Sequence, residues 1–92
     1  MPYIPQEDRE KLDGLIEEIA ATVDTEGELN YVFSTIASLM AARWGTRYAE
    51  LNSIYGVFGC AGAEFYRRVI APYEDEKIKQ NGDVNGYDAT ES

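Results

Sequence analysis

The spacing of the apolar residues is the feature that most constrains this chain. In three stretches, beginning at Leu12, Leu29 and Leu51, they recur three and four positions apart, which is the spacing of one face of an α-helix. No window alternates apolar and polar residues for long enough to indicate a strand. The sequence therefore predicts an all-α fold, a small bundle of three main helices.

Local signals place the ends of the first two helices. The first is predicted over roughly residues 6–23, with Pro5 at its start, because proline suits the first turn of a helix. Asp24–Gly27 then interrupts the pattern with residues that favour a turn. The second helix should end near Trp44-Gly45, since glycine is a common helix C-cap.

The third helix is the longest and contains a proline. Thr46 is its predicted N-cap. Pro72 should kink this C-terminal helix rather than end it, because helix-forming residues flank the proline on both sides. Asn81-Gly82 is the predicted stop. This gives a single helical domain over residues 1–80 and a flexible tail over residues 81–92, which holds almost no large apolar residues.

The composition excludes several classes of function. The chain has no histidine and one cysteine, which removes the usual metal and haem ligand sets and any acyl-transfer triad that uses histidine. Its net charge of −9 opposes binding to bulk nucleic acid or to an anionic membrane. It shows no membrane-helix or signal-peptide pattern. We therefore expect a cytoplasmic protein, not an enzyme, with no metal and no cofactor.

The predicted second helix has an unusual surface. It carries no charged residue from Leu29 through Ala42, whereas a helix on the surface of a small monomer normally has a charged face. Either the other two helices cover it or a second copy of the chain does. We favour the second copy, because a chain of 10.3 kDa buries only about 64% of its extended surface and two helices would cover a third incompletely.

Small residues indicate where two copies would meet. On the second helix they lie opposite the stripe of large apolar residues. On the third helix they lie about a quarter-turn away from the corresponding stripe. A glycine inside a helix costs about 1 kcal/mol relative to alanine, so a compensating close contact is expected there. Cys60 is expected to be a buried packing residue. The predicted oligomer interface comprises Ser34, Ser38, Ala41, Gly56, Gly59 and Ala63.

Charge is divided unevenly along the chain. Residues 1–28 carry a net charge of −7, residues 29–70 carry +2 and residues 71–92 carry −4. The guanidinium group of arginine binds phosphate or carboxylate through two hydrogen bonds, and tyrosine rings can stack on a base. The arginines of the middle region either pair with acids of the first helix or of Glu74–Glu76, or form an anion site across subunits. The predicted ligand-binding residues are Tyr66, Arg67, Arg68, Tyr73 and Lys77.

Both ends of the chain resemble a family of small phage and bacterial proteins that is known as a domain of unknown function. The opening MPYI…EDR…LD covers residues 1–13, and the closing EFYRRVIAPYEDEKIKQNGDV covers residues 64–84. The family has no assigned activity, so the resemblance implies only a phage-type protein. The residues after Val84 extend beyond the family's shorter ending.

These features lead to two functional hypotheses. The first is a homo-oligomer that binds and sequesters a small phosphate-bearing, nucleotide-like signalling ligand, and so inhibits host antiviral immunity. It rests on an analogy, since small phage proteins without catalytic groups commonly act by occupancy. The alternative is an acidic protein–protein interaction module that blocks or bridges a host or phage protein through its first helix. Binding of nucleotides to the purified protein would separate the two hypotheses.

Overall fold

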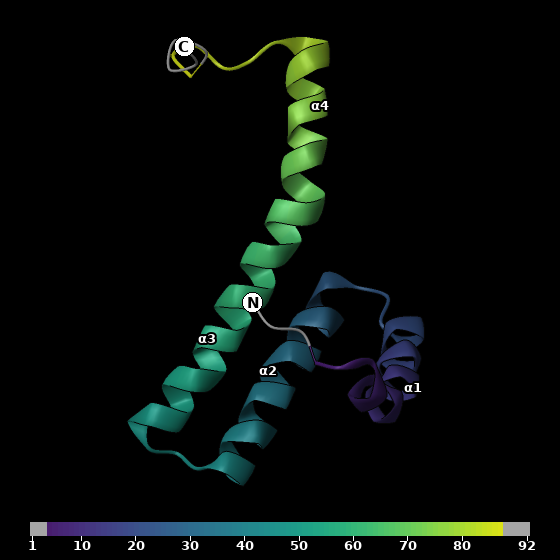
Figure 1. Cartoon of the computed structure of the whole chain (residues 1–92), viewed down its shortest axis with the longest axis vertical. Coiled ribbons are helices and arrows are strands. Elements are labelled where there is room, and N and C mark those ends of the chain that lie inside the picture. The colour runs from purple at the N-terminus through teal and green to yellow at the C-terminus, as the bar shows by residue number, and fades with distance from the viewer. Residues whose placement is uncertain (1–3, 88–92) are drawn as a thin grey trace. The chain divides into compact units, whose positions relative to one another are not determined.

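The computed structural model describes residues 4–87, and every regular element in that range is helical (Figure 1). No strand occurs among these residues, so the predicted all-α class is confirmed. Residues up to Ile54 and residues from Tyr55 onward form two separate units. The elements are α1 (Gln6–Thr22), α2 (Glu26–Trp44), α3 (Tyr48–Phe65), the π-helical turn η1 (Tyr66–Ile70) and α4 (Ala71–Asn81).

α1 begins directly after Pro5, whose carbonyl accepts a hydrogen bond of 3.0 Å from the Asp8 amide. Glu7 and Asp8 occupy the first turn, where the helix dipole favours negative charge. The helix ends at Thr22, one residue before the predicted end. The predicted first helix is therefore confirmed.

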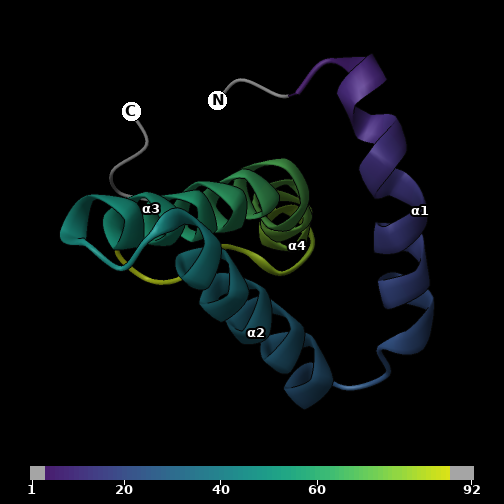
Figure 2. The ribbon, with the colours of Figure 1, turned by 90° about the horizontal axis from the view of Figure 1, so that it is seen from below.

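A capping box starts α2, after a short connection from α1 (Figure 2). The Thr25 hydroxyl accepts from the Glu28 amide at 3.1 Å, and Glu28 Oε1 accepts from the Thr25 amide at 3.2 Å. This exchange satisfies amides that a helix start leaves without partners. The predicted turn over Asp24–Gly27 is therefore wrong in its second half, because Glu26 and Gly27 already lie in α2.

The end of α2 and the start of α3 are set by different signals. Gly45 ends α2 as predicted, with a φ of 125° that favours glycine. The predicted N-cap Thr46 is wrong by one residue. The Arg47 carbonyl accepts the first helical bond, at 3.1 Å from the Leu51 amide, and α3 begins at Tyr48.

The helical backbone of the second unit continues through Pro72 without a break, as predicted (Figure 1). It does so by widening into η1 before the proline. In an α-helix the proline ring would clash with the carbonyl four residues earlier, here that of Arg68, and proline lacks an N–H. In η1 the Ala71 amide instead donates to the Tyr66 carbonyl, five residues back. The wider turn thus takes up one extra residue where the proline must fit. This π-turn was not predicted from the apolar spacing.

α4 ends at Asn81, and Gly82 follows with a φ of 84°, so the predicted helix stop is confirmed. The last residues of the predicted flexible tail, 88–92, lie outside the described residues. The division into one domain over residues 1–80 and a tail stays a prediction.

Burial is very limited in the described part of the chain. Ile54 is its one buried apolar residue, at 9% exposure. α1 and α2 contain no buried residue, and large apolar side chains are exposed on every helix. The chain therefore presents apolar helical faces that no part of residues 4–87 covers fully.

Candidate functional site

The π-turn sets the register of the side chains around it. Residues eight apart in an α-helix point in directions that differ by about 80°. The extra residue absorbed by η1 removes most of this difference, and so brings Tyr66 and Glu74 onto one line along the helix. The Tyr66 hydroxyl donates a short hydrogen bond to Glu74 Oε1. This contact joins η1 to α4.

The hydrogen bond to Glu74 raises the pKa of Tyr66 above its ordinary value of 10.0. The negative charge of Glu74, partial burial of the phenol and the charge of Asp75 act in the same direction, because each disfavours the tyrosinate form. The Tyr66 hydroxyl therefore stays protonated at neutral pH and acts as a hydrogen-bond donor.

Arg67 and Arg68 converge on one carboxylate. Arg67 Nη2 lies 3.0 Å from both oxygens of Glu64, and Arg68 Nη1 lies 3.5 Å from Glu64 Oε1. The spacings of three and four residues place these side chains on neighbouring turns of one helix. The predicted partners were acids of the first helix or of Glu74–Glu76, so Glu64 is a different partner, although this spacing could have identified it.

The remaining predicted ligand residues form a separate contact. Lys77 Nζ lies 5.6 Å from the centre of the Tyr73 ring, within the range of a cation–π interaction. It also lies 3.5 Å from Gln80 Oε1. The five predicted ligand residues thus fall into three local groups on one helical stretch: Tyr66 with Glu74, Arg67 and Arg68 with Glu64, and Tyr73 with Lys77. A single ligand contacting all five stays a prediction.

Charges balance along this helical stretch. Between residues 64 and 79, four cationic side chains accompany four acidic ones. An anion that binds Arg67 would compete with Glu64 for the guanidinium fork, although each arginine carries five N–H donors. The arrangement can therefore hold one anionic group between adjacent guanidinium groups, in competition with Glu64. The charged residues are Glu64, Arg67, Arg68, Glu74, Asp75, Glu76, Lys77 and Lys79.

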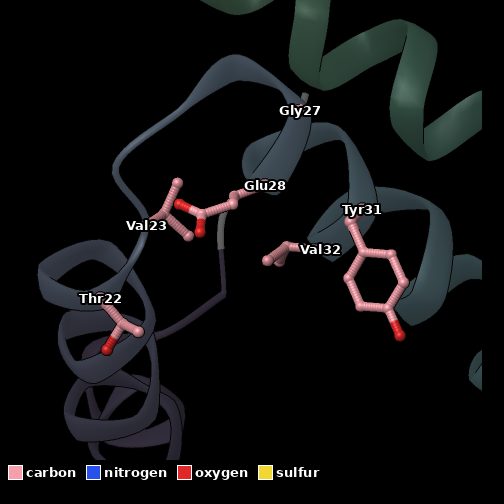
Figure 3. A pocket seen from close by; sticks show the side chains of 6 residues that line it. All are labelled: Thr22, Val23, Gly27, Glu28, Tyr31 and Val32. Atoms are coloured by element: carbon pink, nitrogen blue, oxygen red, sulfur yellow. The ribbon is translucent and has the colours of Figure 1, made fainter.

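A shallow apolar hollow lies in the first unit, at the corner between α1 and α2 (Figure 3). It has a volume of about 330 Å³, and Val23 and Val32 line it beside the capping residue Glu28. The predicted ligand residues do not line it. Its wall is nearly all apolar, so it suits an apolar side chain better than a phosphate.

The predicted interface residues lie mostly on open surface. Ser34, Ser38, Gly56, Gly59 and Ala63 are exposed, and Ala41 is half-buried. A Cβ at Gly56, Gly59 or Gly62 would meet nothing within 4 Å outside its own helix backbone. Cys60, predicted to be buried, is exposed. The described chain therefore lacks the close contact expected to compensate for the glycines.

α1 presents an apolar stripe with acidic neighbours. Leu12, Leu15, Ile16 and Ile19 lie at the spacing of one helical face, and all four are exposed, by 38–59%. Nine acidic residues against two basic ones occur in residues 1–28. The helix is therefore amphipathic, with an acidic polar side and an apolar side that no described residue buries.

Within residues 4–87, no helix is long and apolar enough to cross a membrane. The same residues contain no group of three or more histidine, cysteine, aspartate or glutamate side chains placed to hold a metal ion.

Comparison with protein families matches the chain to the domain of unknown function DUF6899 over residues 1–84. The chain belongs to this family. No curated protein and no solved structure matches the chain. The DUF6899 match takes in all the described helices and every predicted ligand and interface residue. It ends at Val84, where the sequence resemblance also ends.

Proposed function

We propose that this DUF6899 protein is a non-enzymatic binding protein that docks α1 onto another protein. One observation carries the proposal: the apolar stripe of α1 is exposed along the helix. A helix of 17 residues gains most of its stability in a protein by burying an apolar face. An uncovered face of this kind therefore fits a groove on a partner.

The side chains of α1 define the chemistry of that partner. Leu12, Leu15, Ile16 and Ile19 have the i, i+3, i+4, i+7 spacing of anchors that enter an apolar groove. Asp13, Glu17 and Glu18 lie on the other faces of the helix, so the rim of the groove should be basic. The resemblance to phage and bacterial proteins supports a partner in the bacterial cytoplasm, either a host protein or a phage protein.

Affinity purification with paired variants tests this proposal. Leu15→Glu puts a charge on an exposed apolar position, so the chain should still fold but should retain the partner at least tenfold less. The double variant Glu17→Lys/Glu18→Lys should weaken retention most at low salt. Salt screens the attraction between these two acids and a basic rim of the groove, so the attraction that the variant removes is largest when little salt is present. Glu76→Lys in α4 is the matched charge-reversal control and should retain the partner as wild type does. A partner that Leu15→Glu retains fully would overturn the proposal.

A second candidate function is sequestration of a small phosphate-bearing ligand, which would inhibit host immune signalling. The observation that favours it is the convergence of the Arg67 and Arg68 guanidinium groups on one planar oxyanion, the Glu64 carboxylate. A phosphate group has oxygens that can take the same donors. Exposed Tyr66 and Tyr73 lie on the same helical stretch and could stack on a base.

Calorimetry with mono-, di- and cyclic nucleotides tests the second candidate. Loss of one charged hydrogen bond costs about 1.5–3 kcal/mol, so Arg67→Ala or Arg68→Ala should weaken binding at least tenfold. Glu64→Gln should strengthen binding, because it removes the competing carboxylate charge. Absence of heat across the whole nucleotide panel would reject this candidate and leave protein binding.

A further inference from the structure

We infer that the stretch Tyr55–Ala63 of α3, called here the charge-free segment, is the surface on which a second copy of the chain docks, with the same segment of that copy against it. This inference goes beyond the docking of α1 and uses different residues.

The charge-free segment is open along its length. Every residue from Tyr55 to Ala63 is exposed, including Tyr55 at 77% and Val57 at 60%. These two positions are about 200° apart around a helix, so apolar side chains project from opposite sides of α3. A helix that is apolar on several faces is normally enclosed by neighbours. The described second unit has only one helical stretch, from Tyr55 to Asn81, and cannot supply such a neighbour to itself.

The exposed apolar area on the Tyr55 side of the helix accounts for about half of an interface between two copies. Four large side chains on this side, in the segment or just beyond it, taken at about 200 Å² for an aromatic residue, leave on the order of 400 Å² uncovered. A standard interface buries about 800 Å² on each partner. The small residues between these side chains can contribute the rest. The four residues are Tyr55, Phe58, Phe65 and Val69.

The lack of charge makes this segment a surface on which a second copy can dock. A copy carries the same net charge of −9, so most of its surface repels the chain. In a two-fold dimer each copy presents the same patch to the other. The patch must therefore carry no excess of charge of either sign, because like charges would face one another. The segment meets this condition, since it holds no charged residue. The uncharged stretch Leu29–Ala42 of α2 meets it too, but several of its residues are already half-buried.

The backbone of the segment can be approached closely. Gly56, Gly59 and Gly62 have nothing within 4 Å of the position of a Cβ, apart from their own helix backbone. A side chain added at one of them therefore clashes with nothing in the described chain, and should favour the helix. It would, however, hold a second helix away. Such a variant separates an effect on folding from an effect on assembly.

Sedimentation velocity over a wide range of concentrations tests the inference on the full chain. Wild type should sediment above 10.3 kDa in a concentration-dependent way. Gly59→Leu should weaken self-association at least tenfold while its helical circular dichroism is kept or increased. Gly14→Leu is the matched control, because Gly14 is an equally open glycine in the middle of α1, and it should associate as wild type does. Tyr55→Glu, which places like charges on the same side of the helix as Gly59, should also weaken association.

Two results would overturn the inference: wild type that stays at 10.3 kDa at every concentration, or Gly59→Leu and Tyr55→Glu both associating as wild type does. Self-association is measured on the pure chain, whereas docking of α1 is measured by retention of a second protein. Either proposal can therefore fail while the other holds.

Discussion

At the scale of single residues, the hydrogen bond between Tyr66 and Glu74 should be measurable in the titration of the Tyr66 phenol. It raises the pKa of Tyr66 above 10.0, so the bond contributes to stability below pH 10 and is lost as the pH rises through the raised pKa. Glu74→Gln should lower the pKa of Tyr66 toward its ordinary value. The measurement is tyrosinate absorbance against pH, with the Tyr66→Phe variant subtracted to isolate this phenol.

Glu76→Gln serves as the control for that titration, because it removes a nearby acid that does not contribute to the raised pKa. It should leave the titration of Tyr66 in place. A titration that Glu74→Gln does not change would contradict the contact between η1 and α4.

A second residue-scale prediction concerns the start of α2. Thr25→Ala removes the hydroxyl that accepts from the Glu28 amide and should lower the free energy of unfolding by about 1 kcal/mol. Thr46→Ala should change it by less than about 0.5 kcal/mol, since the Arg47 carbonyl, rather than Thr46, accepts the first bond of α3. Urea unfolding followed by circular dichroism measures both. An equal loss in the two variants would contradict these helix starts.

At the scale of elements, Pro72 explains why η1 exists. Pro72→Ala restores an amide donor and removes the ring clash, so the π-turn should revert to an α-helix. Tyr66 and Glu74 would then differ in direction by about 80°, and the pKa of Tyr66 should fall toward 10.0 although both residues are still present. Helical circular dichroism should be kept. A Tyr66 titration that stays raised in Pro72→Ala would show that the proline does not set this register.

The helices were largely predictable from the sequence, whereas the contacts around them were only partly so. Apolar spacing and the glycines at Gly45 and Gly82 located the helices and their ends, because these signals are local. The pairing of Glu64 with Arg67 and Arg68 was missed although it follows from helical spacing. The Tyr66–Glu74 contact was not predictable from α-helical spacing, since it depends on the one extra residue in η1.

At the scale of the whole molecule, exposed apolar faces imply that folding and binding are linked. Hydrophobic burial is the main favourable term in folding, and within residues 4–87 Ile54 is the one apolar residue that is buried rather than half-buried or exposed. The sequence predicts an interface at Gly56 and Gly59, but a small residue packs equally well within a chain or between chains. The structure adds that the described chain places nothing within 4 Å of a Cβ at Gly56, Gly59 or Gly62, and the interface stays a prediction.

The dependence of unfolding on protein concentration tests this central claim most directly. If copies of the chain cover one another's apolar faces, assembly stabilises the folded state by mass action. For a dimer, each tenfold increase in concentration adds about 1.4 kcal/mol to the free energy of unfolding. We expect the thermal midpoint of wild type to rise steadily with concentration, and that of Gly59→Leu to rise much less. A wild-type midpoint that is the same at all concentrations would contradict the account.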